Sequence, residues 1–366
     1  MSKKMRINII GSATSIHTVK WANFLASKGH VVIIHSFVAR NPSLMNEIRV
    51  YRVPKFSQLK EFLFYIPKLK SEVKMFSPDV VQVHSMGSYA LLSLFFKSKN
   101  KVMTPWGSDV LLFGHNFFKW IVLLLAVKSA NYFTCDSQEV RAKLISLGAD
   151  HRRIYLVNFG VDTTIYRKLS SKELNVELGL RPGFPIVVST RSFETIYDLP
   201  TLLYAMSHLN SQGIYAQLLL IGSGSTEDEL RYLSDKLGLQ DQVIFAGRVE
   251  NSELPIYLNS SDIYVSTSLS DAGIAASTAE AMSCELPCII TDVRENRWWI
   301  QDSVNGFLFE QKNSKDLAAL LRRLIESPEI SLSIGEKARE KIILSNDFVT
   351  EMSKVESIYS KGGNID

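Results

Sequence analysis

The stretch RINIIGSATSIHTVKWANFLASKGHVVII, residues 6–34, decides the fold. An apolar run at 6–10 ends at Gly11, a helix-length segment follows at 17–28, and a second apolar run begins after Gly29. Short apolar runs bounded by glycine predict buried strands, and the longer segment between them predicts a helix. We therefore expect the chain to begin with a strand–helix–strand unit whose two strands are parallel.

The same alternation continues along the chain and restarts once, after a turn-rich passage at 181–185. Later strands are predicted at 80–83, 101–103, 132–134, 186–189, 216–221, 243–245, 263–266 and 288–291, and later helices at 199–209, 227–237, 253–258, 277–282 and 314–325. Such alternation predicts parallel sheets covered by helices on both faces, and 366 residues suit two domains. We expect an α/β protein of two doubly wound, Rossmann-like domains that face each other across a cleft. The expected divisions are 1–168, 169–345, and a C-terminal helix at 346–366 that packs back toward the first domain.

The composition is that of a globular protein with little excess charge. Hydrophobic residues make up 46% of the chain, and 41 lysines and arginines against 37 aspartates and glutamates give a net charge of +4. This is far below the basic density of a dedicated nucleic-acid-binding protein, so nucleic acid is not an expected partner. Three cysteines without zinc spacing favour a reducing compartment, and no apolar signal segment follows Met1. We expect a cytoplasmic location, with any membrane contact peripheral and on the inner face.

Two segments bear on that membrane contact. The apolar run at 120–127 is too short to cross about 30 Å of hydrocarbon and predicts a buried helix. In the segment 51–74, basic residues alternate with aromatic and aliphatic ones, a pattern that could lie on an anionic membrane surface. A solvated helix face gives the same pattern, and Pro54 and Pro67 limit the helix length. Both interpretations of 51–74 stay open.

Candidate ligand residues follow the strands of the second domain, where open α/β sheets bind ligands. Arg191 comes just after the strand at 186–189 and could neutralise a diphosphate, although a solvated surface arginine is the alternative. Glu280, on the helix at 277–282, lies among small and apolar residues. A carboxylate there needs partners, which could be ribose hydroxyls or a group in the core.

Glycines and small residues mark places where the backbone could approach an anion. Gly222 and Gly224 follow a strand and precede a helix, so their amides could face a phosphate or a base, or they could serve only to reverse the chain. The small residues at 273–277 would let amides at a helix start approach a pyrophosphate.

Two histidines are expected at the cleft edge. His17 lies in the first loop, and His84 follows the strand at 80–83. Each could donate a hydrogen bond to substrate or shuttle a proton. A hydrogen-bonded loop histidine is the alternative for both.

The run from Ser268 to Asp292, with Asp271, Ser277 and Glu280 within it, resembles the donor-site signature of the GT-B glycosyltransferases of family 4. The resemblance covers about residues 6–326 and extends to Arg191, Tyr197, Leu202, Gly222–Gly224, Phe245–Val249, Asn296–Ile300, Asn305–Phe309, Gly11, Gly29, His30, His84 and Gly107–Asp109.

The resemblance implies a GT-B fold and a retaining hexosyltransferase. Such an enzyme moves a sugar from a nucleoside-diphosphate donor, with UDP as the expected nucleotide, to a hydroxyl of a glycan or lipid-linked glycan. A role in bacterial-type surface polysaccharide assembly would fit. The family needs no metal or other cofactor, because cationic side chains and helix dipoles neutralise the diphosphate.

The resemblance also assigns roles to residues. Donor-binding roles fall on Gly11, Arg191, Gly222, Gly224, Gly247, Arg248, Val249, Ala276, Ser277, Thr278 and Glu280. Within this set Glu280 would bind the ribose, Arg191 the diphosphate, and residues 247–249 the base. The catalytic candidates are Asp271, His84 and Asp109, and the acceptor-side candidates are His17 and Trp106.

Three positions depart from the family pattern. Ala272 stands where many members have a glutamate, so the adjacent Asp271 is the candidate replacement. Ile196 stands where a lysine is usual, and Trp106 where a histidine is common. These departures favour an alternative, a degenerate non-catalytic GT-B subunit that binds nucleotide or glycan and supports a partner transferase. A third alternative is a GT-B nucleotide-sugar epimerase, whose carboxylate and histidine sets are not evident here.

Overall fold

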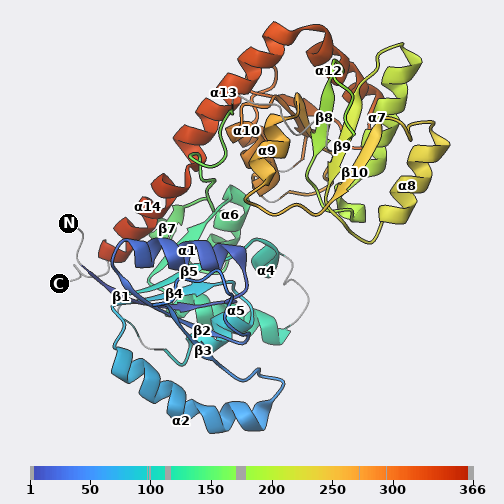
Figure 1. Ribbon diagram of the computed structural model, residues 1–366. Helices are drawn as coiled ribbons and strands as arrows, with labels where there is room; N and C mark the ends of the chain where they lie inside the picture. Colours follow the sequence, from blue (N-terminus) through green and yellow to red (C-terminus); the bar gives the residue numbers. More distant parts are fainter. Residues whose placement is uncertain are drawn as a thin grey trace. The chain divides into compact units, whose positions relative to one another are not determined.

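Two α/β units, each built around a sheet of parallel strands, make up the protein. The computed structural model describes residues 4–96, 98, 100–111, 117–169, 179–271, 273–293 and 295–361 (Figure 1). The chain divides into a first unit, Met1–Phe159 with Val349–Asp366, and a second unit, Gly160–Phe348. Both expected boundaries, after 168 and after 345, therefore fall inside the second unit.

The first unit contains a seven-stranded parallel sheet in the order β3-β2-β1-β4-β5-β6-β7. Its strands are β1 (Arg6–Ile10), β2 (Val31–Ser36), β3 (Arg49–Arg52), β4 (Val80–His84), β5 (Lys101–Thr104), β6 (Tyr132–Cys135) and β7 (Ile154–Leu156). Its helices are α1 (Ile16–Ser27), α2 (Leu59–Phe76), α3 (Ser88–Ser93), α4 (Ser108–Leu111), α5 (Phe117–Ser129), α6 (Gln138–Ser146), the 3-10 turn η1 (His151–Arg153) and α14 (Phe348–Lys361). The strand order reverses between β1 and β4, which lie side by side.

The second unit contains a six-stranded parallel sheet in the order β10-β9-β8-β11-β12-β13. Its strands are β8 (Ile186–Ser189), β9 (Gln217–Ile221), β10 (Val243–Gly247), β11 (Ile263–Ser266), β12 (Cys288–Thr291) and β13 (Phe307–Phe309). Its helices are η3 (Thr195–Tyr197), α7 (Leu199–Ser211), α8 (Glu227–Lys236), α9 (Leu254–Asn259), α10 (Ala276–Ser283), α11 (Asn296–Trp299), α12 (Ser314–Glu326) and α13 (Pro328–Asn346). Here the order reverses between β8 and β11.

The central strands are buried along their whole length. Every residue of β4, β8, β9, β11 and β12 is buried. Strands of this kind need helices on both faces of the sheet, as the alternation predicts. In the first unit, Phe62 and Leu69 of α2 join the core that contains Val81 and Val83 of β4. Ligands bind such sheets at the carboxyl ends of the strands, where the order reverses.

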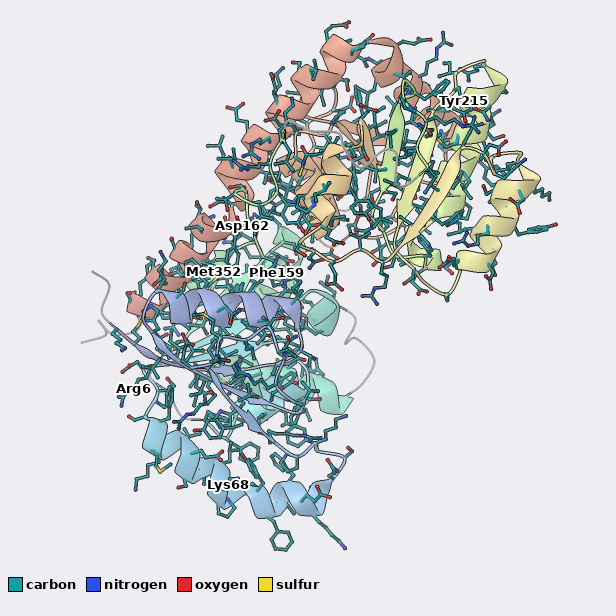
Figure 2. The ribbon with its side chains drawn as sticks, in the orientation of Figure 1. Arg6, Lys68, Phe159, Asp162, Tyr215 and Met352 are labelled. Atoms are coloured by element: carbon teal, nitrogen blue, oxygen red, sulfur yellow. The ribbon has the colours of Figure 1, made fainter. Side chains whose placement is uncertain are left out.

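The C-terminal helix α14 belongs to the first unit. The phenol of Tyr359 donates a hydrogen bond to the Gln82 side chain of β4 at 2.8 Å, and the amide of Asn100 donates to the Tyr359 carbonyl at 2.6 Å. Glu356 lies 2.9 Å from Nε2 of His30. Met352, labelled in Figure 2, is buried on the same helix. The first unit is therefore built from both ends of the sequence.

Three strands lie outside the predicted set, β3, β7 and β13. Each has three or four residues and forms an edge of its sheet. An edge strand is covered less than a central one and needs no long apolar run, so hydrophobic periodicity does not reveal it.

Two helices differ from expectation. The predicted buried helix at 120–127 is part of α5, which buries Leu123 and Val127 but leaves Trp120 46% and Leu125 48% exposed. Helix α2 continues through Pro67, which lies on its exposed side, where water can replace the lost backbone hydrogen bond. Within the described residues, no helix combines the length and the hydrophobicity that a membrane span requires.

Two histidines of the first unit are buried, and at one of them, His35, burial lowers the pKa although Nε2 lies 3.6 Å from the Glu72 carboxylate. His35 is fully buried with Nδ1 2.9 Å from Oδ1 of Asn8, and His84 has Nδ1 3.0 Å from the Thr18 hydroxyl. Burial lowers the pKa of His35 to about 4 and that of His84 to about 3. In the unfolded chain both return to the ordinary pKa of about 6.5.

We therefore expect stability to fall as the pH drops below about 6.5. Above that pH each histidine is neutral in both the folded and the unfolded chain. Below it, the unfolded chain binds protons that the folded chain does not. Each histidine should then cost about 1.4 kcal/mol per pH unit until its folded pKa is reached. Urea unfolding at about pH 7, 6 and 5 would measure this slope. His35→Gln should make it shallower by one proton, and equal slopes for parent and variant would contradict the assignment.

Candidate functional site

A buried arginine lies at the carboxyl ends of β8 and β11, where the second sheet reverses its order. Arg191, two residues after β8, is only 8% exposed. Its Nη2 donates to Oδ1 of Asp271 at 2.7 Å and to the Ser268 hydroxyl at 3.3 Å, and its Nη1 donates to the Ser277 hydroxyl at 3.1 Å. Asp271 and Ser268 follow β11, and Ser277 lies in the first turn of α10. One guanidinium thus joins three segments of the unit.

An aromatic ring covers the same guanidinium. The Tyr197 ring centroid is 4.2 Å from Cζ of Arg191, and the Tyr197 carbonyl accepts a hydrogen bond from the Thr267 hydroxyl at 2.7 Å. In the described part of the chain, Nε of Arg191 is buried with no hydrogen-bond partner. A cation removed from water is costly unless it is paired, and here a carboxylate and a π face stabilise it. The alternative of a solvated surface arginine is wrong.

The start of α10 faces this cluster without a side-chain cap. Its N-cap residue, Ala275, has no side chain that can accept a hydrogen bond from the first turn. Ala276 is exposed, Ser277 is half-buried and Thr278 is buried. The Ser277 hydroxyl is held by Arg191 and by the Tyr264 phenol at 2.9 Å. Uncapped amides at a helix start are suited to bind an anion.

Glu280, one turn further along α10, has a partner in the core. It is half-buried and interacts with the phenol of the buried Tyr166, which itself donates a hydrogen bond to the Asn251 carbonyl at 3.3 Å. Burial first and this carboxylate second raise the pKa of Tyr166. Burial also raises the pKa of Cys284 to about 12, and the charge of Glu280 contributes to that shift. A carboxylate has about four acceptor positions, so an interaction with Tyr166 is compatible with ribose binding, which stays a prediction.

The glycines after β9 allow two loops to approach closely. A Cβ atom on Gly222 would lie 2.8 Å from the Arg191 carbonyl, and one on Gly224 would clash with the Phe193 backbone. The Phe193 amide donates to the Ser223 carbonyl at 3.0 Å. These glycines therefore leave space for the loop that carries Arg191. Neither interpretation from the sequence included this explanation for the two glycines.

The predicted base-binding residues adjoin the same place. The Gly247 carbonyl accepts a hydrogen bond from the Gly222 amide at 2.8 Å. Arg248, which follows, is exposed, and Val249 is half-buried against the core. The structure thus brings residues 247–249 beside the loop of Gly222.

In the first unit, Gly11 and His84 meet at the point where β1 and β4 diverge. A Cβ atom on Gly11 would lie 2.9 Å from Cβ of His84, so only glycine fits without a shift. The His84 ring is enclosed, and in the described residues its Nε2 has no partner. With a pKa of about 3 it is neutral at physiological pH. The enclosure favours the hydrogen-bonded loop histidine, and a catalytic role stays a prediction.

The other candidates of the first unit gather around His84. The His17 ring stacks on Phe159 at 4.0 Å between centroids and lies 5.9 Å from the Trp106 ring. Burial first and Lys20 second lower the pKa of His17 to about 4. The structure therefore brings the two acceptor-side candidates, His17 and Trp106, together.

Asp109 ties two loops together through its carboxylate. Its Oδ1 accepts from the Trp106 amide at 2.9 Å, and its Oδ2 accepts from the Met86 amide at 2.6 Å. Both oxygens thus hold backbone, which is the arrangement of a positioning residue. Its catalytic role stays a prediction.

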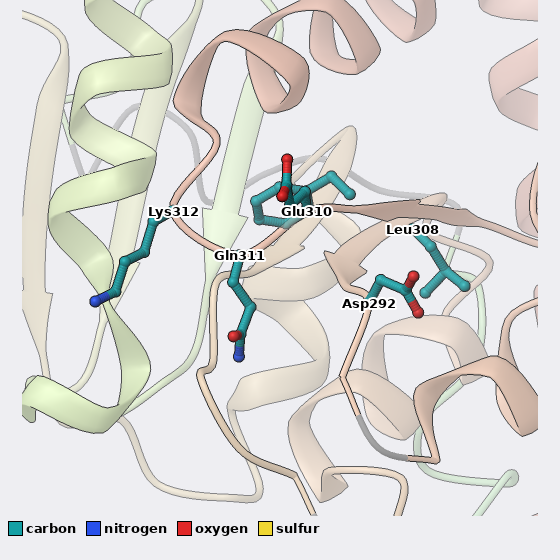
Figure 3. Close-up of a pocket in the computed structure, with 6 residues that line it drawn as sticks. Asp292, Leu308, Glu310, Gln311 and Lys312 are labelled. Carbon is teal, nitrogen blue, oxygen red and sulfur yellow. The ribbon is translucent and has the colours of Figure 1, made fainter.

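A pocket that the sequence did not single out opens beside the arginine cluster. It has a volume of about 440 Å³ and is lined by Asp292, Leu308, Phe309, Glu310, Gln311 and Lys312 (Figure 3). The lining residue Gln311 donates a hydrogen bond to the Leu269 carbonyl at 2.7 Å, and Thr291, next to the lining residue Asp292, donates to the Ser268 carbonyl at 2.5 Å, so the pocket adjoins the segment of Asp271. The short strand β13 gave too weak a signal to mark this turn beforehand.

Two further findings limit the site. Ala272, the position of the displaced glutamate, lies outside the described residues. Among the residues that are described, no three or more His, Cys, Asp or Glu side chains are grouped to hold a metal ion. The need for a metal therefore stays a question for experiment.

Family descriptions match both units. "Glycosyl transferases group 1" matches residues 170–341, and "Glycosyl transferase 4-like" matches residues 6–137. Together they include the arginine cluster, the start of α10, and the cluster around His84.

Individual proteins are similar over nearly the whole chain. N-acetyl-alpha-D-glucosaminyl L-malate synthase of Bacillus anthracis is 23% identical over 92% of this chain and 90% of its own. Alpha-monoglucosyldiacylglycerol synthase of Streptococcus pneumoniae is 22% identical over 96% of this chain and 87% of its own. The crystal structure of Anabaena HepE in complex with UDP-glucose has a TM-score of 0.80 at 19% identity, covering 98% of this chain and 100% of the other. The fold is therefore GT-B, and the chain belongs to the family 4 glycosyltransferases.

Proposed function

We propose that this glycosyltransferase moves a hexose from a UDP-sugar to a hydroxyl of a glycan or lipid-linked glycan, with retention of anomeric configuration and without a metal. The observation that carries the proposal is the Arg191 guanidinium, buried at the strand ends and bonded to the first turn of the uncapped helix α10. A fixed cation and helix amides together suit a leaving diphosphate, whose charge grows as the glycosidic bond breaks.

Arg191 is the centre of the proposed chemistry. A guanidinium has five N–H donors, and three hydrogen bonds hold it in place through Nη1 and Nη2. Of the two remaining donors Nε–H is buried, so the second Nη1–H is the one left for a phosphate oxygen, and the cation does not have to be reorganised during the reaction. With Ile196 in place of the usual lysine, the amides of α10 take the rest of the phosphate charge.

Asp271 has a different proposed role from the one its sequence position suggested. Its carboxylate is 10% exposed and 2.7 Å from Nη2 of Arg191, so it orients the cation and balances its charge before donor binds. We therefore treat Asp271 as a positioning residue rather than a group that contacts the sugar.

The donor and acceptor follow from similar proteins. Anabaena HepE binds UDP-glucose, which supports a UDP-hexose donor. The name of the Streptococcus relative describes synthesis of a glucosylated lipid, which supports an acceptor that carries a lipid. A place in surface polysaccharide assembly rests on the family resemblance alone. Three buried cysteines suit the proposed cytoplasmic location.

The purified full chain should hydrolyse or transfer sugar from a UDP-hexose on its own. We expect activity to persist in EDTA, because Arg191 and the helix amides replace a divalent ion. NMR of the product gives the anomer, and an inverted product would overturn the retention part. Nucleotide binding without turnover over a broad acceptor panel would instead support the non-catalytic subunit.

Two variants separate the proposed roles of Arg191 and Asp271. Arg191→Ala should lower kcat about 10²- to 10³-fold and weaken UDP binding, as expected for loss of a charge-stabilising donor. Asp271→Ala should weaken UDP binding about tenfold and destabilise the fold by about 3 kcal/mol, because it leaves a buried cation unpaired. Calorimetry with UDP and urea unfolding measure both effects.

Asp271→Asn is the matched control for that role. It keeps a hydrogen-bond acceptor for Nη2, so UDP affinity should recover most of the loss seen with alanine. If asparagine lowers kcat as much as alanine does while UDP affinity stays at the parent value, Asp271 contacts the sugar and the positioning role is wrong.

Glu280 should recognise the ribose. We expect Glu280→Gln to weaken UDP binding at least about tenfold and to abolish the preference for UDP over its 2′,3′-dideoxy form, because a charged acceptor of two hydroxyls is lost. Tyr166→Phe removes the core partner of Glu280 and should keep the preference. A parent protein that binds both nucleotides equally would show that Glu280 is only a structural residue.

A further inference from the structure

The outer side of helix α2 presents lysines and apolar side chains together. Along one row of the helix the exposed residues are Leu59, Leu63, Pro67, Lys70 and Lys74, and along the adjacent row they are Lys60, Phe64, Lys68, Ser71 and Met75. Residues three and four apart lie next to each other on a helix, so these two rows form one continuous surface. We call this surface the α2 face.

The apolar residues of the α2 face are strongly exposed, which a helix face that only contacts water does not require. Phe64 is 85% exposed, Met75 77%, and Leu59 and Leu63 are above half. The opposite side of the helix supplies the core contacts, with Phe62 and Leu69 buried. The α2 face therefore leaves most of the surface of these hydrophobic side chains in contact with solvent.

The charges on the helix are separated in the same way except at Lys68, whose Nζ lies 3.8 Å from Oε1 of Glu72. Glu72 is buried and accepts a hydrogen bond from the Tyr65 phenol at 2.8 Å. Glu61 lies at the margin of the face and accepts from Gln58 at 3.0 Å. The lysines at 60, 68, 70 and 74 are exposed, with Lys68 labelled in Figure 2. The α2 face is thus positively charged over a helix of 18 residues, or about 27 Å.

On the opposite side of α2, Phe95, just after α3, has its ring centroid 5.5 Å from that of the buried Phe62. In the view of Figure 1, α2 is the outermost described helix at the lower edge of its unit.

We propose that the α2 face docks the protein onto the surface of a bilayer that contains anionic lipids. The lysines would contact the headgroups, and Leu63, Phe64 and Met75 would enter the boundary between headgroups and acyl chains. The lysines alone or the apolar side chains alone would bind a membrane weakly, since lysines in water are solvated and a few apolar side chains bind neutral bilayers poorly. Their combination on one face is what anionic lipid surfaces bind. This inference is independent of the proposed reaction.

Sedimentation with vesicles tests the α2 face in the full chain. The protein should bind vesicles of phosphatidylcholine mixed with phosphatidylglycerol, bind phosphatidylcholine alone much less, and be released by high salt. Lys60→Gln with Lys68→Gln and Lys74→Gln should reduce binding roughly fivefold per lysine. Leu63→Ser with Phe64→Ser should reduce it at least about tenfold.

Matched variants in the second unit control for loss of charge and of hydrophobicity in general. Lys236→Gln with Lys315→Gln and Lys337→Gln removes three exposed lysines, and Tyr232→Ser with Leu344→Ser removes two exposed apolar side chains, 69% and 71% exposed. These variants should bind as the parent does. Equal loss in the control and α2 variants would overturn the assignment, as would a parent that binds neither vesicle, or both equally well.

A fluorescent label reports insertion directly. The cysteines of the chain, Cys135, Cys284 and Cys288, are all buried, so Phe64→Cys provides one accessible thiol. An environment-sensitive dye on Cys at 64 should shift to the blue with anionic vesicles, and the same dye after Tyr232→Cys should not. A shift at both positions, or at neither, would overturn the proposal.

Discussion

The positive charge of Arg191 needs a counterion within the protein, because only 8% of the residue's surface is exposed to water. A buried cation without a counterion costs several kcal/mol, so the surroundings must supply one. Asp271 does this directly, while the Ser268 and Ser277 hydroxyls and the Tyr197 ring complete the shell. The loop after β11, the start of α10 and the loop after β8 are thereby fixed relative to one another.

The two units use one geometry for different chemistry. In each, a glycine permits close approach near the point where the strand order reverses: Gly11 against His84 in the first, Gly222 against the Arg191 loop in the second. The first cluster is neutral and aromatic, with His84 held uncharged by burial. The second is ionic. The buried charge is thus concentrated in the second unit, while the first presents neutral rings and backbone amides.

Much of this could be predicted from sequence, for reasons that also explain the rest. Buried central strands and the helices between them have strong periodic signals. The position of Arg191 could be predicted because it directly follows one of these strands, β8. The edge strands β3, β7 and β13 are too short to give one. The pairing of Arg191 with Asp271 joins residues 80 positions apart, and only the fold brings them together. The reason for Gly222 and Gly224, space for a neighbouring loop, likewise belongs to tertiary structure. Pro67 shows the reverse, because a strong local rule against proline in a helix is relaxed where water can serve the open carbonyl.

The origin of the first unit from both chain ends sets an order on its synthesis. Buried polar groups on the early part of the sheet, Gln82 and Asn100, find their partners in Tyr359, more than 250 residues later. During translation the continuous second unit is complete before those partners emerge. The usual sequence, in which the N-terminal domain matures first, is therefore inverted. Gln82 and Asn100 can therefore pair with Tyr359 only after the intervening second unit has been synthesised.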